Sequence, residues 1–144
     1  MKKLVFFFLV VFAATSFAQD STGTTGFSLT LTVKNISSDE GKISVALCNS
    51  SENYTDNEKP FIGKIVEIKD GIAVIVYENI PAGEYGVKLY HDEDGNGKLN
   101  TNFLGIPSED YAFSNNAKGS FGPASWEDAK FSVDGNTEIS IDLN

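Results

Sequence analysis

The polar stretch DEDGNGKLN, residues 92–100, has the residue spacing that most directly suggests chemistry. Acidic and amide side chains alternate at its start and a glycine follows them: Asp92, Asp94, Asn96 and Gly97. They match the first, third, fifth and sixth positions of a calcium-binding loop, in which side-chain oxygens hold the ion and the glycine allows a sharp turn. This spacing predicts a site for calcium or a similar hard cation.

The match covers only half of such a loop. Its twelfth position, where a bidentate glutamate should complete the coordination, is Phe103. Another oxygen donor is therefore needed after the chain folds back, and Asn100, Asn102, Glu109 or Asp110 could supply it. The alternative is a plain turn, because Asp, Asn and Gly also form turns. Three consecutive acids favour the cation, since like charges repel and a turn does not need them. The predicted ligands are Asp92, Asp94, Asn96 and Asn100.

Catalytic residues are hard to find elsewhere in the sequence. His91 is the only histidine, and the alternation of its strand predicts that it packs against the core. Cys48 is the only cysteine, so no internal disulfide can form, and we expect a buried, unreactive thiol rather than a reactive one. The sequence has no GxSxG elbow, HExxH helix or phosphate-binding glycine loop. We expect a non-catalytic protein, with an enzyme of unrecognised type as the less favoured alternative.

Charge limits the classes of partner. The chain has 20 acidic residues against 11 basic ones, a net charge of −9, and every basic residue is lysine. Such a charge repels nucleic acid and anionic lipid, and the missing arginine removes the bidentate fork that recognises phosphate. The expected partners are a divalent cation and a protein or glycan.

The N-terminus has the pattern of a signal peptide at residues 1–18. Lys2 and Lys3 precede an apolar run, and small residues, Ser16 and Ala18, stand where signal peptidase cleaves. Residues 19–26 then form a flexible leader, and 27–144 a single domain. No later apolar stretch reaches the about 20 residues of a membrane span, so we expect no span after cleavage. The predicted location is periplasmic or extracellular.

Alternation of apolar and polar residues with period two predicts strands along the mature chain. Asp70-Gly71 is expected to form a tight hairpin turn between two of them, and Ser125 to cap one helical turn. The pattern predicts an all-β fold, an antiparallel seven-stranded sandwich of the immunoglobulin-like or prealbumin-like kind. Its expected core includes Leu31, Val45, Leu47, Val74, Val87, Leu89, Phe131 and Ile141.

One long irregular loop interrupts this pattern over residues 99–128. It contains glycine and proline but is too aromatic for a disordered linker. The aromatic residues could cap one end of the sandwich. Alternatively, the aromatic loop 103–126 could bind a carbohydrate or a peptide, with Tyr111, Phe113 and Trp126 as the candidate binding residues.

The same part of the chain resembles a bacterial family. The most specific segments are His91–Gly105, FSNN at Phe113–Asn116, and FGPASWEDAKF at Phe121–Phe131. They are similar to the hallmark region of the domain-of-unknown-function 2141 family, and the likeness spans nearly the whole mature chain. It implies a signal peptide, one β-sandwich module and no assigned activity. The turn Ile80–Tyr85 is also similar to turns in transthyretin-like and carboxypeptidase-regulatory sandwiches.

Processing of the N-terminus gives a first testable prediction. Cleavage after Ala18 removes two lysines, so the exported protein should begin at Gln19 and carry a net charge of 9 − 20 = −11. Intact-mass measurement of exported protein checks this, and the mass of the whole chain or of another cut would contradict it.

Overall fold

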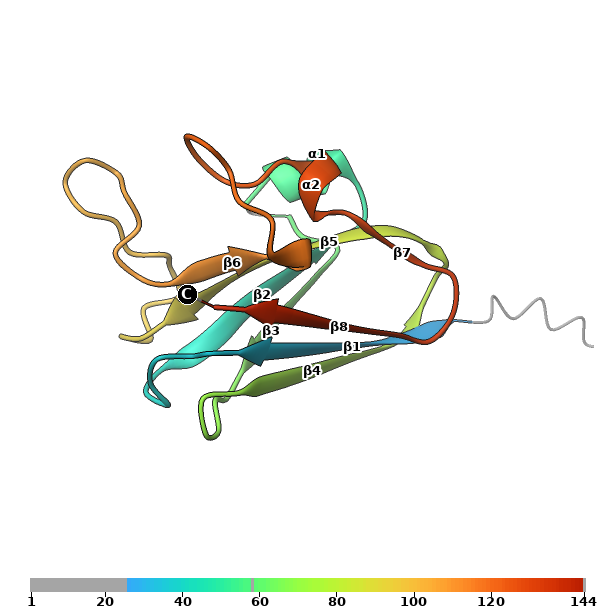
Figure 1. Ribbon diagram of the computed structural model, residues 1–144, viewed down its shortest axis with the longest axis horizontal. Helices are drawn as coiled ribbons and strands as arrows, with labels where there is room; N and C mark the ends of the chain where they lie inside the picture. The colour runs from blue at the N-terminus through green and yellow to red at the C-terminus, as the bar shows by residue number, and fades with distance from the viewer. Residues whose placement is uncertain (1–25, 58, 144) are drawn as a thin grey trace, which may run out of the picture.

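Two packed β-sheets dominate the computed structural model, which describes residues 26–57 and 59–143 (Figure 1). The predicted signal peptide and nearly all of the predicted leader lie outside these residues. Among the described residues, no helix has the length and apolar character needed to cross a membrane. The strands are β1 Phe27–Lys34, β2 Lys42–Cys48, β3 Ile62–Val66, β4 Ala73–Ile80, β5 Gly83–Asp92, β6 Tyr111–Phe113, β7 Phe131–Val133 and β8 Thr137–Asp142.

The strands form a three-stranded sheet in the order β4-β1-β8 and a five-stranded sheet in the order β3-β2-β5-β6, with β7 also paired to β5. The all-β prediction is confirmed, but two details of it are wrong. Residues 26–57 and 59–143 form eight strands because β6 forms inside the expected loop, and β1 pairs with β8 in parallel. Alternation indicates which face of a strand is buried and carries no information about the direction of its neighbour.

The core lies between the two sheets. Six of the eight expected core residues are buried: Leu31, Val45, Leu47, Val87, Leu89 and Ile141. Phe131 is half-buried against them. The prediction for Val74 is wrong, because its side chain is 53% exposed and Ala73 and Ile75 face inward instead. The segment AVIVY is apolar on both faces, so alternation could not select the buried one.

The predicted tight turn forms at Asp70 and Gly71, but the predicted hairpin is wrong, because β3 and β4 lie in different sheets and only the bridge between Lys69 and Ile72 pairs across the turn. Asp70 and Gly71 both have positive φ, 54° and 71°, which suits a tight turn. The Asp39 carboxylate accepts hydrogen bonds from both backbone N–H groups, at 2.9 and 2.8 Å, and so fixes the turn to the loop between β1 and β2.

Two short helices, α1 Ser51–Thr55 and α2 Trp126–Ala129, lie together beside the five-stranded sheet (Figure 1). The helical turn α2 was predicted, and Ser125 caps it by accepting a hydrogen bond from the Asp128 N–H. The helix α1 was not predicted, because its five residues are too few to show a helical period. Its capping box uses Asn53 where the usual signature has Glu or Gln.

A pair of substitutions tests the buried face. Leu31→Ala should lower the free energy of unfolding by about 2 to 5 kcal/mol, because Leu31 is fully buried and its truncation leaves a cavity. Val74→Ala on the exposed face should cost less than about 1 kcal/mol. Urea unfolding of both variants measures the difference, and equal losses would contradict the assigned register.

Candidate functional site

Strand β5 separates the core from the candidate sites. Its inward side chains, among them Val87, Leu89 and His91, are buried, whereas Lys88 and Tyr90 face outward and are half-buried. His91 was predicted on the core side and is fully buried there, with Nε2 2.6 Å from the Glu40 carbonyl oxygen.

Cys48 is also buried, as expected. Its Sγ donates a hydrogen bond to the Asn53 carbonyl oxygen at 3.4 Å, and burial raises the pKa of the thiol. A raised pKa disfavours the reactive thiolate at neutral pH.

The predicted cation loop brings three carboxylates together where β5 ends. Asp92, Asp94 and Glu109 each place one oxygen within 4.8 Å of the others. Ligand oxygens at about 2.3 to 2.6 Å from a calcium ion are at most about 5 Å apart, so this spacing fits one ion. Asp92 and Glu109 are only 6% and 7% exposed. Burial of two carboxylates is costly unless donors or a cation compensate for it.

Backbone N–H groups provide part of that compensation. Asp92 accepts from the N–H groups of Asn96 and Gly97 at 3.1 and 2.9 Å. Glu109 accepts from the N–H groups of Glu93 and Asn100 at 3.0 and 2.9 Å. A carboxylate offers about four lone-pair sites, so each keeps acceptor capacity for an ion.

The predicted ligands Asn96 and Asn100 surround Asp94. Both amide groups donate to Asp94 Oδ2, at 2.9 and 2.8 Å. The hydrogen bond from Asn100 holds the pKa of the Asp94 carboxyl below its usual value. All four predicted ligands therefore meet, and Glu109 supplies the further donor that the half-loop needed. For Asn100 to coordinate a cation, its amide must turn so that Oδ1 replaces Nδ2.

A wide groove of about 1330 Å³ lies on the outer face of the five-stranded sheet. Its floor follows two rows of paired residues across the strands. One row is Ile65, Ser44, Tyr90 and Tyr111, and the other is Gly63, Ala46, Lys88 and Phe113. The small residues Ser44, Ala46 and Gly63 beside the large ones on β5 and β6 form the hollow.

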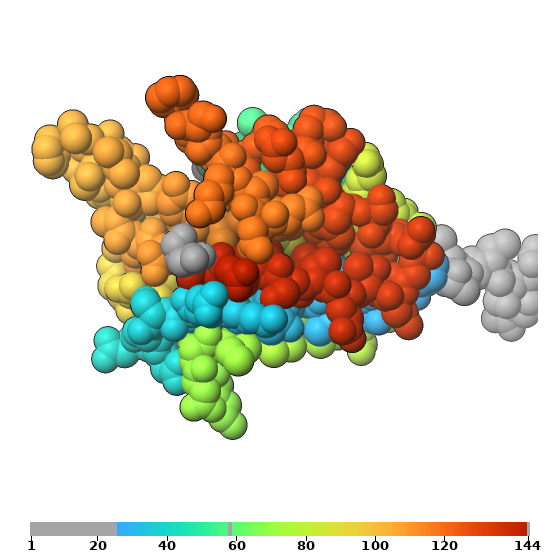
Figure 2. Space-filling view, viewed as in Figure 1, coloured from blue at the N-terminus to red at the C-terminus, as the bar shows by residue number. Residues whose placement is uncertain are grey.

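Two loops and α1 wall this groove. The excursion after β5 and the segment before α2 both line it and project from the sandwich as separate lobes (Figure 2). Phe103 and Phe121, near the ends of the two excursions, are almost fully exposed. The aromatic residues of loop 103–126 therefore do not simply cap the core.

The three predicted aromatic candidates all line the groove. The ring of Tyr111 packs edge-on against Phe113 at 5.8 Å between centroids. Tyr54 of α1 contacts Phe113 at 6.4 Å and Trp126 at 5.6 Å, and so links them. We call Tyr111, Phe113, Tyr54 and Trp126 the aromatic row. Tyr111 is 41% exposed and Trp126 half-buried, whereas Phe113 and Tyr54 are buried.

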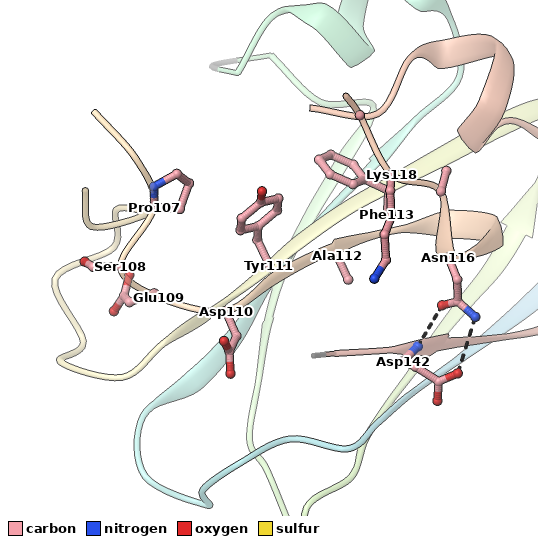
Figure 3. A pocket seen from close by; sticks show the side chains of 12 residues that line it. Pro107, Ser108, Glu109, Asp110, Tyr111, Ala112, Phe113, Asn116, Lys118 and Asp142 are labelled. Atoms are coloured by element: carbon pink, nitrogen blue, oxygen red, sulfur yellow. Dashed lines mark hydrogen bonds between the residues drawn. The ribbon is translucent and has the colours of Figure 1, made fainter. Parts of the chain in front are cut away.

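A second, smaller hollow of about 490 Å³ lies along β6 (Figure 3). Tyr111 and Phe113 project to one side of β6 while Asp110 and Ala112 project to the other. At its end the Asn116 amide bonds to Asp142 in both directions, at 2.9 and 3.3 Å. This hollow is acidic.

Some site residues were not predicted from sequence. Tyr54 and Lys88 were missed because α1 was not expected and because Lys88 looked like an ordinary outward residue of a strand. Glu109 was one of four possible donors. The only signal for it was its place in the excursion that follows the loop.

Comparison with known families finds a match to this chain, a family of bacterial proteins. A family model described as "Uncharacterized protein conserved in bacteria (DUF2141)" matches residues 31–140. The chain belongs to this family. No curated protein and no solved structure gives a significant match to this chain. The DUF2141 match contains the whole acidic cluster, the groove floor and the aromatic row.

Replacement of Glu109 tests its role in this DUF2141 protein. Glu109→Gln should lower the free energy of unfolding by roughly 1 to 3 kcal/mol without calcium, because an amide keeps one acceptor oxygen and places N–H groups against a backbone donor. Glu138→Gln, an exposed position on β8, is the control for charge. Urea unfolding in chelator compares them, and equal stabilities would mean that Glu109 does not hold the loop.

Proposed function

We propose that this DUF2141 protein is an exported, non-catalytic binding module whose loop 92–100 is stabilised by calcium. The observation that carries the calcium proposal is the convergence of Asp92, Asp94 and Glu109 oxygens within 4.8 Å. Two of these carboxylates are buried in an already acidic protein, and a divalent cation compensates for their repulsion.

The placement of the reactive residues supports a non-catalytic role. His91 and Cys48 are the only imidazole and thiol of the chain, and both are fully buried. The His91 ring lies on the opposite face of β5 from the groove. Export is supported by the signal-peptide pattern of residues 1–18, which predicts a periplasmic or extracellular protein.

The aromatic row supports a second element of function, ligand binding in the groove. Aromatic faces beside polar groups bind carbohydrate rings or peptide side chains, and Tyr111 and Trp126 line the same groove. We therefore propose the groove as the ligand site, with a glycan or a peptide as the first classes to test.

The calcium proposal predicts a change in thermal stability. Coordination through three carboxylates with an incomplete loop should be weak, with a Kd of about 0.1 to 1 mM, as in other extracellular modules. Calcium at about 100 times the Kd should stabilise the fold by about 2.7 kcal/mol. A melt of the mature domain in chelator and then in calcium measures this.

Variants make this experiment specific. Asp94→Asn should remove most of the gain in calcium and leave the sandwich folded, because Asp94 is exposed and buries no apolar surface. Asp134→Asn, in an exposed turn before β8, changes the charge equally and should keep the gain. Magnesium should substitute poorly, since its small octahedral shell fits an irregular loop badly. If calcium leaves the midpoint of thermal unfolding unchanged, the loop is a plain turn and not a calcium site.

A further inference from the structure

The charge of the groove is opposite to that of the whole chain. The described residues that line it include three lysines and no aspartate or glutamate, although the chain carries a net charge of −9. The smaller hollow along β6, in contrast, is lined by three acids and one lysine: Glu109, Asp110, Asp142 and Lys118. Acidic side chains are thus absent from the lining of the groove and predominate in that of the smaller hollow.

Two of the three lysines supply the groove with positive charge. Lys64 Nζ is turned toward the opposite sheet, where it donates to the Val76 carbonyl oxygen and lies 4.7 Å from the Tyr77 ring centroid. Lys88 stands on the floor of the groove, and Lys98 is exposed on its wall, within the cation loop 92–100.

Lys88 is partly engaged by its neighbours and keeps capacity for a ligand. Its Nζ donates to the Tyr54 carbonyl oxygen and to Asn57 Oδ1, and lies 5.3 Å from the Tyr54 ring centroid. An ammonium has three donors, so one remains beyond these two bonds. Burial lowers the pKa of Lys88, while the nearby Asp56 opposes that shift. A bound anion would likewise favour the charged form.

The walls have the same character as the floor. Residues 95–108 and 111–126 contain no acid, and of their two lysines Lys98 lines the groove and Lys118 the smaller hollow. Outside the groove lining, the excursion 95–108 exposes three large apolar side chains: Phe103 94%, Leu104 67% and Ile106 55%. Exposed apolar groups on acid-free loops of an acidic protein mark an interaction site.

We propose that the groove binds an amphipathic anion, a molecule with an apolar body and one carboxylate head. The body lies along Tyr90, Tyr111 and Trp126, and the head lies between Lys88 and Lys98. This inference rests on the groove being the ligand site proposed above and names the ligand class. A groove larger than the about 300 to 1,000 Å³ of compact ligand pockets suits an elongated molecule.

The ligand is a free molecule rather than a lipid in an anionic bilayer. A bilayer presents many negative charges to a whole face of the protein, and the net charge of the chain opposes that approach. A single carboxylate within the groove interacts mainly with charges inside one Debye length, about 8 Å at physiological salt. The charges that line the groove are lysines, and the acids beside it, Asp56 near Lys88 and Asp128 at Ser125, lie outside the lining.

Trp126 provides the readout, because it is the only tryptophan of the chain and lines the groove. The mature protein is titrated in chelator with decanoate, decyltrimethylammonium and decyl maltoside, which share one chain and differ in head charge. Decanoate should change the Trp126 emission saturably, with a Kd at least about tenfold below those of the other two. Added salt should weaken the binding of decanoate.

Four variants locate the binding. Lys98→Gln and Lys88→Met should each raise the Kd for decanoate by about fivefold or more, and Lys69→Gln, exposed in the turn between β3 and β4, should leave it unchanged. Ser44→Phe fills the floor beside Tyr90 and should abolish binding. Because Lys88 also bonds to residues of and after α1, far-ultraviolet circular dichroism checks that Lys88→Met is folded. If that variant unfolds, the Kd of Lys98→Gln alone tests the proposal.

Several outcomes overturn the inference, and they separate it from the proposed function. Equal affinity for the three amphiphiles would show that the groove does not recognise the anionic head. Equal effects of Lys98→Gln and Lys69→Gln would show the same. If the protein sediments with phosphatidylglycerol vesicles and does not bind decanoate, its partner is an anionic bilayer and not a free molecule. If maltohexaose or an uncharged peptide changes the Trp126 emission and decanoate does not, the groove is a ligand site but its ligand is not an amphipathic anion. If none of the probes binds, both fail.

Discussion

The alternation of side chains along β5 is the constraint on which the rest of the structure depends. Successive side chains of an extended strand point to opposite faces, so one strand serves the core and the surface at once. The inward residues Val87 and Leu89 hold the two sheets together, while Lys88 and Tyr90 form the groove floor. The strand ends at Asp92, the first of the clustered carboxylates. A shift of one residue would exchange core and floor and displace the acidic cluster.

The elements around β5 explain why its outer face stays hollow. Gly86 provides the room in which Trp126 and Tyr54 pack, since a Cβ there would lie 2.9 Å from the Trp126 ring. The two helices therefore cover one end of the outer face, and the loops after β5 and before α2 border the rest. Ser114 secures this arrangement from beneath: it accepts from the Val87 N–H and donates to the Ala129 carbonyl oxygen, both within 2.8 Å.

Sequence reasoning predicted the parts that depend on local pattern. Period-two alternation located the buried faces of β1, β2 and β5, and the Asp70-Gly71 pair located a turn, because each signal lies within a few residues. It failed where distant partners decide. The three-residue strand β6 is too short to show a period, and the parallel pairing of β1 with β8 joins segments more than 100 residues apart. The ligand spacing from Asp92 was visible in the sequence, whereas the choice of Glu109 over its neighbours required the fold.

The distribution of charge connects the two candidate sites. Acids gather where backbone N–H groups and a cation can compensate for them, at Asp92, Asp94 and Glu109, and the intervening excursion 95–108 contains none. That excursion is also a wall of the groove, and Glu109, which follows it, binds the N–H groups of Glu93 before it and of Asn100 within it. Any cation held by the cluster would therefore reduce the motion of the wall and add positive charge at its base. Both effects favour an anion in the groove, so a cation in the acidic cluster would strengthen the binding that the lysines already provide in its absence.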